Sequence, residues 1–243
     1  MPIFLKAAIN GARSKSEHAG LPVTVEAIAH DAQEVIAAGA HAIHFHVRDS
    51  AGRESLSPDD VERCIVACRT SVPTAPLGVS TGAWIVPSLP ARLALIRAWR
   101  TQPDFASVNF AEEGAEEVAQ LLQTRGVSIE LGLSSPTDAA RALATGWDKR
   151  CIRILLEPGE TDVALALATV KAIEQILGEA HTPAPRLLHG SVVTAWPLLI
   201  EAVRRGYQSR AGFEDTLRLP TGELAVSNAQ LVSIARALMG SDS

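Results

Sequence analysis

Aromatic residues are scarce in this chain, since Phe, Trp and Tyr make up only 4% of its 243 residues. Aliphatic side chains must therefore dominate the core, and the 47% share of hydrophobic residues is ample for one. A basic excess is also missing, because 27 acidic residues and 22 Lys and Arg give a formal net charge of −5. We therefore expect neither nucleic acid nor an anionic membrane as a partner. No apolar run approaches the ~20 residues that span a bilayer.

Cysteine is nearly absent as well. The three cysteines, Cys64, Cys68 and Cys151, form no disulfide pattern. Cys64 and Cys68 stand four residues apart in an expected helix, where a shared packing face explains them better than a metal site does. The first residues, MPIFLKAAIN, do not combine a charged segment with a long apolar one, so we expect no secretory signal. These features favour a protein of the reducing cytoplasm.

Short apolar runs alternate with longer helical patterns along the whole chain. We expect strands at 4–10, 42–47, 76–81, 105–110, 127–133, 151–157, 186–189 and 209–214. We expect helices at 24–39, 57–71, 89–100, 115–124, 136–145, 162–177, 195–205 and 227–238. This alternation, without a linker-like break, indicates parallel strands joined by helical crossovers. We therefore predict one domain over residues 1–243, a (β/α)8 barrel, with a doubly wound open sheet as the runner-up.

Polar residues collect at the carboxyl ends of the expected strands, whereas the amino ends carry few residues that could act in catalysis. The carboxyl ends carry Asn10, His44, His46, Arg48, Asp49, Ser80, Thr81, Ser107, Asn109, Glu130, Glu157, His189, Arg210, Glu214 and Asp215. Active-site groups of a (β/α)8 barrel lie at these ends. The pattern is therefore typical of a catalytic barrel.

The stretch AIHFHVRD places His44 and His46 two residues apart in an apolar strand. Side chains alternate along a strand, so both imidazoles point to the same face. Neutral imidazoles are good ligands for a divalent metal. A hydrogen-bonded strand end explains such a pair equally well when it is taken alone.

The segment SRAGFED at the last strand supplies the carboxylate that a catalytic zinc site usually adds to its histidines. Glu214 and Asp215 are adjacent, and neighbours on a strand face opposite ways. One carboxylate can therefore bind a metal while the other accepts a proton or orients Arg210. A His–His–Glu set fits zinc best, with cobalt, nickel, manganese and iron as alternatives.

Several segments follow one another in a distinctive order: AAINGARSKSEHAGLPVT, AIHFHVRD, GRES, VSTGAW, SVNF, RAGFEDT and SNAQLVSIARAL. Together they resemble the β-keto acid cleavage enzymes, best known from the 3-keto-5-aminohexanoate cleavage enzyme. The resemblance covers nearly the whole chain, although about residues 140–205 look shorter and more divergent. It implies a (β/α)8 barrel with one zinc on His44, His46 and Glu214, assembled as a homotetramer. It also implies that a β-keto acid and acetyl-CoA give acetoacetate and a new acyl-CoA.

The resemblance further implies roles for individual side chains. Asp215 with Arg210 would form the base-bearing pair, and Ser80 would assist near the metal. We expect the substrate to meet Thr81, Ser107, Asn109 and Glu130, which lie in or match the family's motifs. A structural ion pair explains Glu130 at least as well. His189 has three open interpretations: a substrate contact, a contact to the coenzyme phosphates, or packing.

Arg13, in NGAR, departs from the aminohexanoate enzyme, which has a glutamate suited to the cationic amino group of its substrate. The arginine reverses that charge. We therefore predict that Arg13 binds a substrate whose far end is anionic or neutral and polar. The alternative is that Arg13 points to solvent, or that Glu17 replaces the family's glutamate.

Two other functions remain alternatives. A metal-dependent hydrolase could use the same histidines to hold a zinc-bound hydroxide, although such barrels usually carry further His and Asp ligands. A non-catalytic barrel could keep zinc and bind a small acid as a sensor, but it would not need Arg210, Asp215 and Ser80. Turnover that depends on acetyl-CoA would separate the acyltransferase from the hydrolase.

Overall fold

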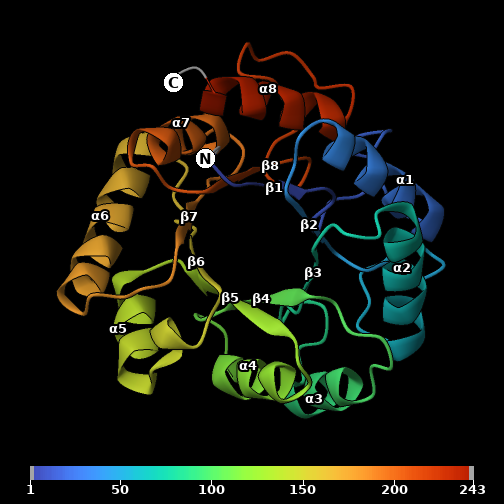
Figure 1. Ribbon diagram of the computed structural model, residues 1–243, viewed down its shortest axis with the longest axis horizontal. Coiled ribbons are helices and arrows are strands. Elements are labelled where there is room, and N and C mark those ends of the chain that lie inside the picture. The colour runs from blue at the N-terminus through green and yellow to red at the C-terminus, as the bar shows by residue number, and fades with distance from the viewer. Residues whose placement is uncertain (1–2, 241–243) are drawn as a thin grey trace.

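The computed structural model describes residues 3–240, in which parallel strands form a ring inside a layer of helices (Figure 1). The strands are β1 (Leu5–Ala8), β2 (Ala42–Phe45), β3 (Leu77–Ser80), β4 (Phe105–Asn109), β5 (Ser128–Leu133), β6 (Arg153–Leu156), β7 (Arg186–Leu188) and β8 (Ser209–Ala211). The helices are α1 (Val25–Ala37), α2 (Pro58–Ser71), α3 (Leu89–Arg97), α4 (Ala115–Thr124), α5 (Pro136–Thr145), α6 (Val163–Glu179), α7 (Ala195–Arg204) and α8 (Asn228–Gly240), with a short 3-10 helix η1 (Trp147–Lys149). The prediction of a (β/α)8 barrel is confirmed.

Closure of the ring separates the barrel from an open sheet. Each strand from β1 to β6 pairs in parallel with the next, and β1 also pairs with β8. A bridge between Leu187 and Gln208 joins β7 to the β8 side, where the Leu188 amide donates to the Gln208 carbonyl over 3.0 Å. The first and last strands are therefore neighbours, as only a barrel requires.

Local sequence signals explain where the helices begin. The Thr24 side chain accepts a hydrogen bond from the Ala27 amide at the start of α1, as its position predicts. Pro58 opens α2 in the first turn, but Ser57 makes no side-chain capping bond in the described structure. Cys64 and Cys68 are both fully buried on the inner face of α2, in agreement with a packing role.

The last strand is shorter than predicted. β8 ends at Ala211, and the Asp215 amide donates to the Gly212 carbonyl over 3.0 Å, so the chain turns there. Glu214 and Asp215 therefore lie on a turn, and the alternation of a strand does not govern their directions. The cause is Gly212, because a Cβ at this position would lie 2.1 Å from the Ala8 carbonyl oxygen. Only glycine lets the chain cross β1 this closely.

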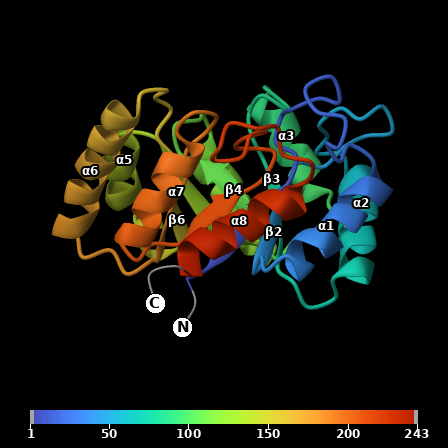
Figure 2. The same ribbon diagram turned by 90° about the horizontal axis from the view of Figure 1, so that it is seen from above.

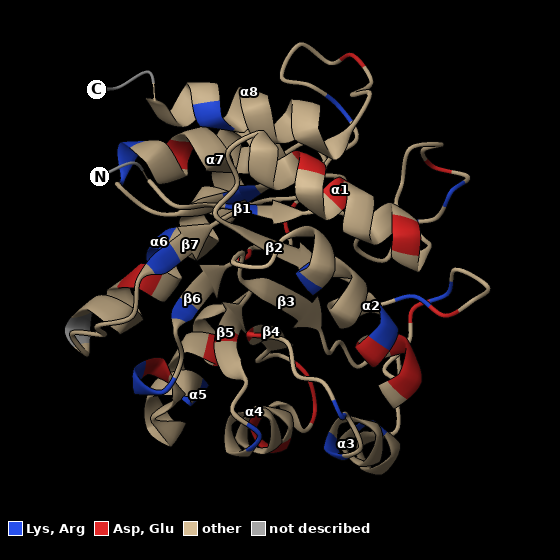
Figure 3. Cartoon of the chain, turned by 45° about the vertical axis from the view of Figure 1, so that its right-hand side comes forward, with Lys and Arg blue, Asp and Glu red and all other residues tan. Residues whose placement is uncertain are grey.

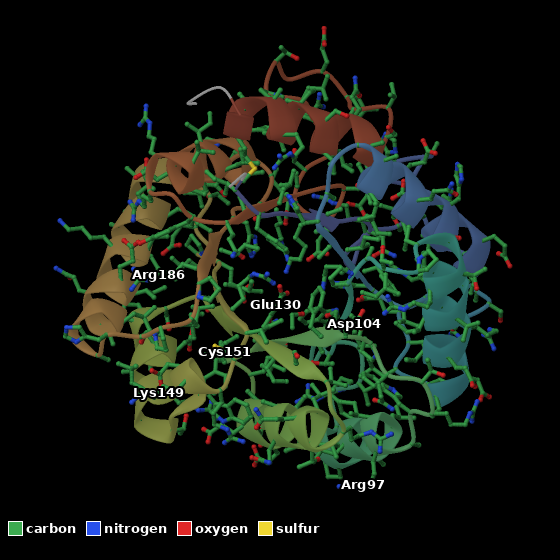
Figure 4. The ribbon with its side chains drawn as sticks, in the orientation of Figure 1. Arg97, Asp104, Glu130, Lys149, Cys151 and Arg186 are labelled. Carbon is green, nitrogen blue, oxygen red and sulfur yellow. The ribbon has the colours of Figure 1, made fainter. Side chains whose placement is uncertain are left out.

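Charged residues occur on the strands of the ring as well as on the outer helices (Figure 3). Lys6 from β1 and Glu130 from β5 are fully buried, and Glu130 points into the centre of the ring in Figure 4. Glu130 Oε2 accepts from Lys6, and Glu130 Oε1 lies 2.5 Å from Arg153 Nη1 of β6. This inner ionic cluster of Lys6, Glu130 and Arg153 fills part of the barrel interior.

The loops that follow β1, β2 and β8 project from one edge of the barrel (Figure 2). This edge holds the carboxyl ends of the parallel strands, where the polar strand-end residues of the sequence converge. Between residues 3 and 240, no helix is both long and apolar enough to cross a membrane.

Candidate active site

A cavity of about 460 Å³ opens at the carboxyl ends of the strands. Residues from most of the strand ends line it, so its wall is assembled from segments that are far apart in the sequence. Its titratable lining residues are His44, His46, Glu112, Glu157, His189, Arg210, Glu214 and Asp215. Its serine and asparagine lining residues are Ser80, Ser107, Asn109, Ser134 and Ser191.

Three of these side chains form a cluster that can hold a metal ion. Glu214 Oε2 lies 3.5 Å from His44 Nε2 and 3.7 Å from His46 Nε2. Donor atoms that share a tetrahedral ion at ~2.0–2.2 Å stand roughly 3.3–3.6 Å apart, so this spacing suits a shared cation. Among the described atoms, Glu214 Oε2 is buried and has no hydrogen-bond partner. The donor set therefore fits a metal.

The protonation states also suit a metal. Burial lowers the pKa of His44 to about 3, which keeps its imidazole neutral with a lone pair free. Burial alone would raise the pKa of Glu214, but Arg210, His44 and His46 hold it well below its usual value. Glu214 is therefore an anionic carboxylate beside two imidazoles.

Surrounding residues hold His46 in place. Its Nδ1 donates to Glu54 Oε1 over 2.5 Å, which turns Nε2 toward Glu214. Histidines that bind a metal commonly donate their other ring N–H to a carboxylate, which fixes the orientation of the ring. His46 lies just beyond β2, and Asn10 fixes its backbone by accepting from the His46 amide over 2.8 Å and donating to its carbonyl over 3.0 Å. Trp84 stacks on the His46 ring, with centroids 6.0 Å apart, and donates to Glu54.

Gly11 makes room for Glu214. The residue has a left-handed φ of +56°, and a Cβ there would lie 2.6 Å from Glu214 Cγ. Any larger side chain would displace the carboxylate as well as strain the backbone. The NGAR segment after β1 therefore shapes the metal cluster through its glycine.

Arg210 and Asp215 form a second, tightly bonded unit. Arg210 Nη2 donates to Asp215 Oδ1 over 2.7 Å, and Nε donates to Oδ2 over 3.1 Å. The same Nη2 lies 2.9 Å from Glu214 Oε1, so one guanidinium holds both carboxylates. Burial raises the pKa of Asp215 above its usual value, although Arg210 opposes the shift. The two hydrogen bonds from Arg210 hold the Asp215 side chain in a fixed direction close to His44, His46 and Glu214.

His189 and Glu157 extend this unit across the pocket. His189 Nδ1 lies 3.8 Å from Asp215 Oδ1, and His189 Nε2 lies 3.3 Å from Glu157 Oε2. Burial lowers the pKa of His189 to about 3, so the ring is neutral. Burial raises the pKa of Glu157 to about 7. His189 lines the cavity, and its three interpretations, a substrate contact, a contact to the coenzyme phosphates and packing, all stay open.

Some of the predicted site residues meet in this pocket. The serines Ser80 and Ser107 and the amide of Asn109 line the same wall as the metal cluster and the Arg210–Asp215 pair. Ser80 Oγ accepts from the Gly82 amide over 3.3 Å. Asn109 Nδ2 donates to Glu112 Oε1 over 3.1 Å.

The remaining predicted residues lie outside the described lining of this pocket. Thr81 is buried and donates to the Ser107 carbonyl over 2.8 Å, so it supports the wall from behind. Glu130 lies deeper in the barrel in its ion pairs with Lys6 and Arg153. Arg13 faces a separate cavity and donates to Glu17 over 2.9 Å. Their roles in binding a substrate stay predictions, although the ion pair offered as the alternative for Glu130 is present.

Sequence reasoning assigned no role to Glu54, Glu112 or Ser134. These residues follow strands β2, β4 and β5 on loops, and no spacing rule relates them to the histidines. Glu157 stood out only as one polar strand end among many. A carboxylate in GRES beside the two histidines was the signal that could have pointed to Glu54.

Comparison with known proteins adds a family to this geometry. A family model described as "beta-keto acid cleavage enzyme" matches residues 2–241. The 3-keto-5-aminohexanoate cleavage enzyme of Acetoanaerobium sticklandii is 25% identical over 247 residues, which cover 95% of this chain and 89% of that protein. The 3-oxoadipate:acetyl-CoA acetyltransferase of Cupriavidus necator is 25% identical over 259 residues, which cover 98% of this chain and 88% of that protein.

Solved structures support the fold. The apo structure of ObcA superposes with a TM-score of 0.72 at 18% identity and covers 89% of this chain. The matched region is 61% of the ObcA chain, so the two proteins share a barrel while ObcA is considerably longer.

Proposed function

The chain belongs to the β-keto acid cleavage enzyme family, and on that premise we propose that it transfers the acyl group of a β-keto acid to coenzyme A. The proposed products from the β-keto acid and acetyl-CoA are acetoacetate and a new acyl-CoA. One observation carries the proposal: the His44, His46 and Glu214 cluster and the Arg210–Asp215 pair line one cavity. A relative named as an acetyl-CoA acetyltransferase supports the choice of co-substrate.

His44, His46 and Glu214 would hold the metal, and their donor types favour zinc. When bound, the ion supplies a Lewis acid that makes the α-proton of the β-keto acid more acidic. The partnerless oxygen of Glu214 and the neutral His44 support this assignment.

Asp215 is the proposed base. Its carboxylate removes a proton from the α-carbon, and the two hydrogen bonds from Arg210 keep it in the orientation that this transfer needs. Arg210 also links the two proposed roles, because its Nη2 contacts both Glu214 and Asp215. Ser80, Ser107 and Asn109 would orient the substrate from the neighbouring wall.

The proposed bond changes balance without an added oxidant or reductant. The α-carbon bonds to the acetyl carbon of acetyl-CoA, and the thioester bond breaks to release coenzyme A thiolate. The thiolate then attacks the original keto carbon, and the bond between that carbon and the α-carbon breaks. The proton held by Asp215 returns to the α-carbon of acetoacetate.

The wider setting is also a proposal. The family resemblance supports a homotetramer and one catalytic domain over residues 1–243, and the cysteine usage supports a cytoplasmic location. Light scattering of the purified protein tests the first point.

Metal analysis and a panel of β-keto acids, each assayed with and without acetyl-CoA, test the function. We expect one metal ion per chain and acyl-CoA formation only when acetyl-CoA is present. Release of a free acid without acetyl-CoA would instead identify a hydrolase. Binding of keto acids without any turnover would identify a sensor.

A further inference from the structure

The wall opposite the metal cluster is the part of the pocket that faces the far end of a substrate. This inference rests on the proposed function, because a metal on His44, His46 and Glu214 that makes the α-proton more acidic would bind the acid end of the β-keto acid. These ligands come from the β2 and β8 ends of the ring. The far end of the substrate therefore extends toward the ends of β4, β5 and β6, where Asn109, Ser134 and Glu157 line the cavity.

Glu157 is a buried carboxylate that forms no ion pair with a Lys or Arg among the residues that the structure describes. Glu157 Oε2 lies 3.3 Å from His189 Nε2, but the neutral imidazole carries no charge to balance the carboxylate. Arg210 is the single Lys or Arg in the described lining, and its Nε and Nη2 bond to Asp215 and Glu214. Burial raises the pKa of Glu157 to about 7, although the charges of Arg210 and Lys6 oppose the shift. About 18% of its side chain remains accessible, so a ligand can reach it.

Asn109 presents an acceptor to the same space. Its Nδ2 donates to Glu112 Oε1, and Glu112 Oε2 in turn accepts from the Ala83 amide over 2.9 Å. Because Glu112 is fixed as an acceptor, the amide of Asn109 is held with Oδ1 on its free side.

Ser134 is restricted in a similar way. Its hydroxyl donates to Asp138 Oδ2 over 2.9 Å, which leaves only lone pairs for a ligand. Asp138 itself is held by the capping box at the start of α5, so this direction is fixed by the helix.

Gly132 on β5 brings two of these acceptors together. A Cβ at Gly132 would lie 2.2 Å from Glu157 Oε1 and 3.2 Å from Asn109 Oδ1. The missing side chain therefore lets the Glu157 carboxylate lie against β5, beside the amide oxygen of Asn109. Any other residue at this position would push Glu157 away.

We propose that Glu157, Asn109 and Ser134 form a binding site for an ammonium group, or another group with several hydrogen-bond donors, at the far end of the β-keto acid. An ammonium ion offers three donors and the missing positive charge. A carboxylate at this end would face acceptors only, with its charge next to Glu157.

The two named relatives leave this choice open, because one name contains an amino acid substrate and the other a dicarboxylic acid. From the sequence, the charge of Arg13 predicts a substrate whose far end is anionic or neutral and polar. Its side chain pairs with Glu17 and faces another cavity, so the acceptors around Glu157 are the groups that the substrate meets.

The test compares β-keto acids of equal length that end in ammonium, methyl or carboxylate, each with acetyl-CoA. We expect the wild-type protein to prefer the ammonium acid over the methyl acid by about 10- to 100-fold in kcat/KM, the range of one charge-assisted hydrogen bond. Glu157→Gln should reduce this ratio by about tenfold or more, mainly through KM. Glu157→Asp should keep part of it, because the charge remains.

Glu160→Gln is the matched control. Glu160 follows β6 on the same loop but bonds to Thr169 and lies outside the described pocket lining, so the ratio should stay at its wild-type value. A wild-type preference for the carboxylate acid would overturn the proposal. So would an unchanged ratio in a folded Glu157→Gln protein, checked by its melting temperature.

Calorimetric binding of the corresponding β-hydroxy acids keeps this result separate from the proposed function. If none of the keto acids is turned over, the proposed reaction is wrong. An ammonium preference in binding that Glu157→Gln removes would still support the recognition site, and the absence of such a preference would overturn it.

Discussion

Two clusters of buried charge occupy the barrel at different depths, and they differ in how completely their atoms are bonded. In the inner ionic cluster, Glu130 uses one oxygen for Lys6 and the other for Arg153. At the mouth, Glu214 Oε2, His44 Nδ1 and His189 Nδ1 have no hydrogen-bond partner among the described atoms. Both oxygens of Glu130 in the inner ionic cluster therefore have partners within the chain. The buried polar atoms of the cavity at the strand ends leave room for a ligand as their partner.

This difference has a physical consequence. Removing an ion from water costs several kcal/mol, and good partners must offset that cost. The inner cluster offsets it with groups from β1, β5 and β6, so it contributes to one defined packing of the ring. The mouth offsets it in part through Arg210, and a cation at His44, His46 and Glu214 would supply the rest. A bound metal should therefore stabilise the folded protein.

Glu214→Gln should have the largest effect on the cavity while leaving the inner ionic cluster unchanged. The change removes the anionic ligand, so we expect metal affinity to fall more than ~100-fold, beyond the effect of losing a second support. Turnover should be lost while the fold is kept. Metal content by mass spectrometry of metals, together with the circular dichroism spectrum, checks both parts. A variant that retains metal and turns over normally would contradict the role of Glu214.

Asp215→Asn separates the base from the metal ligand. We expect a full metal content and a fall in kcat of about 10²- to 10⁴-fold, the usual contribution of a positioned proton acceptor. Steady-state rates at saturating metal measure the effect. Normal turnover of this variant would exclude Asp215 as the base.

Glu130→Gln tests the inner cluster. The change leaves Lys6 and Arg153 without their carboxylate, and breaking a buried ion pair costs about 3–5 kcal/mol in the free energy of unfolding. Urea unfolding measures the loss, and metal content should stay at the wild-type level. A simultaneous loss of metal would mean that the two clusters are not independent.

The difference in unfolding free energy between the wild type and Glu130→Gln should depend on pH. Burial would raise the pKa of Glu130, but Lys6 and Arg153 outweigh it and bring the pKa to about 2, below the ordinary 4.5. A depressed pKa stabilises the folded state above pH 4.5, and this stabilisation is lost as the pH falls toward 2. The stability difference between wild type and Glu130→Gln should therefore shrink over that range. A constant difference down to pH 2 would contradict the ion pairs.

Glu54→Gln is the mildest change. Gln can still accept from His46 Nδ1, but it lacks the charge that orients and strengthens the imidazole. We expect metal affinity to fall about 10- to 100-fold. Competition with a chelator measures the affinity. Glu62→Gln serves as the control, because Glu62 lies on the outer face of α2 in an exposed ion pair with Arg100.

Much of the fold and part of the site could be predicted because their signals are local. The eight strand and helix patterns agree with the structure to within a few residues. Closure of the ring confirms the barrel and excludes the open sheet, which shares the same alternation. The HxH spacing brought His44 and His46 to one face, and the motifs around Arg210, Glu214 and Asp215 indicated their partners. The turn at Gly212 could not be predicted, because it depends on how closely β8 passes Ala8.

The sequence by itself determined the alternation of strands and helices, the pair of imidazoles and the acidic pair, since periodicity and adjacency lie along the chain. Only the tertiary structure decided what each charge faces. Arg13 and Glu157 make the point, because both are charged residues near the strand ends. Closure of the ring directs Glu157 into the pocket beside Asn109, whereas the loop after β1 turns Arg13 toward Glu17. The direction of a side chain depends on contacts between distant strands, and these exist only once the ring has closed.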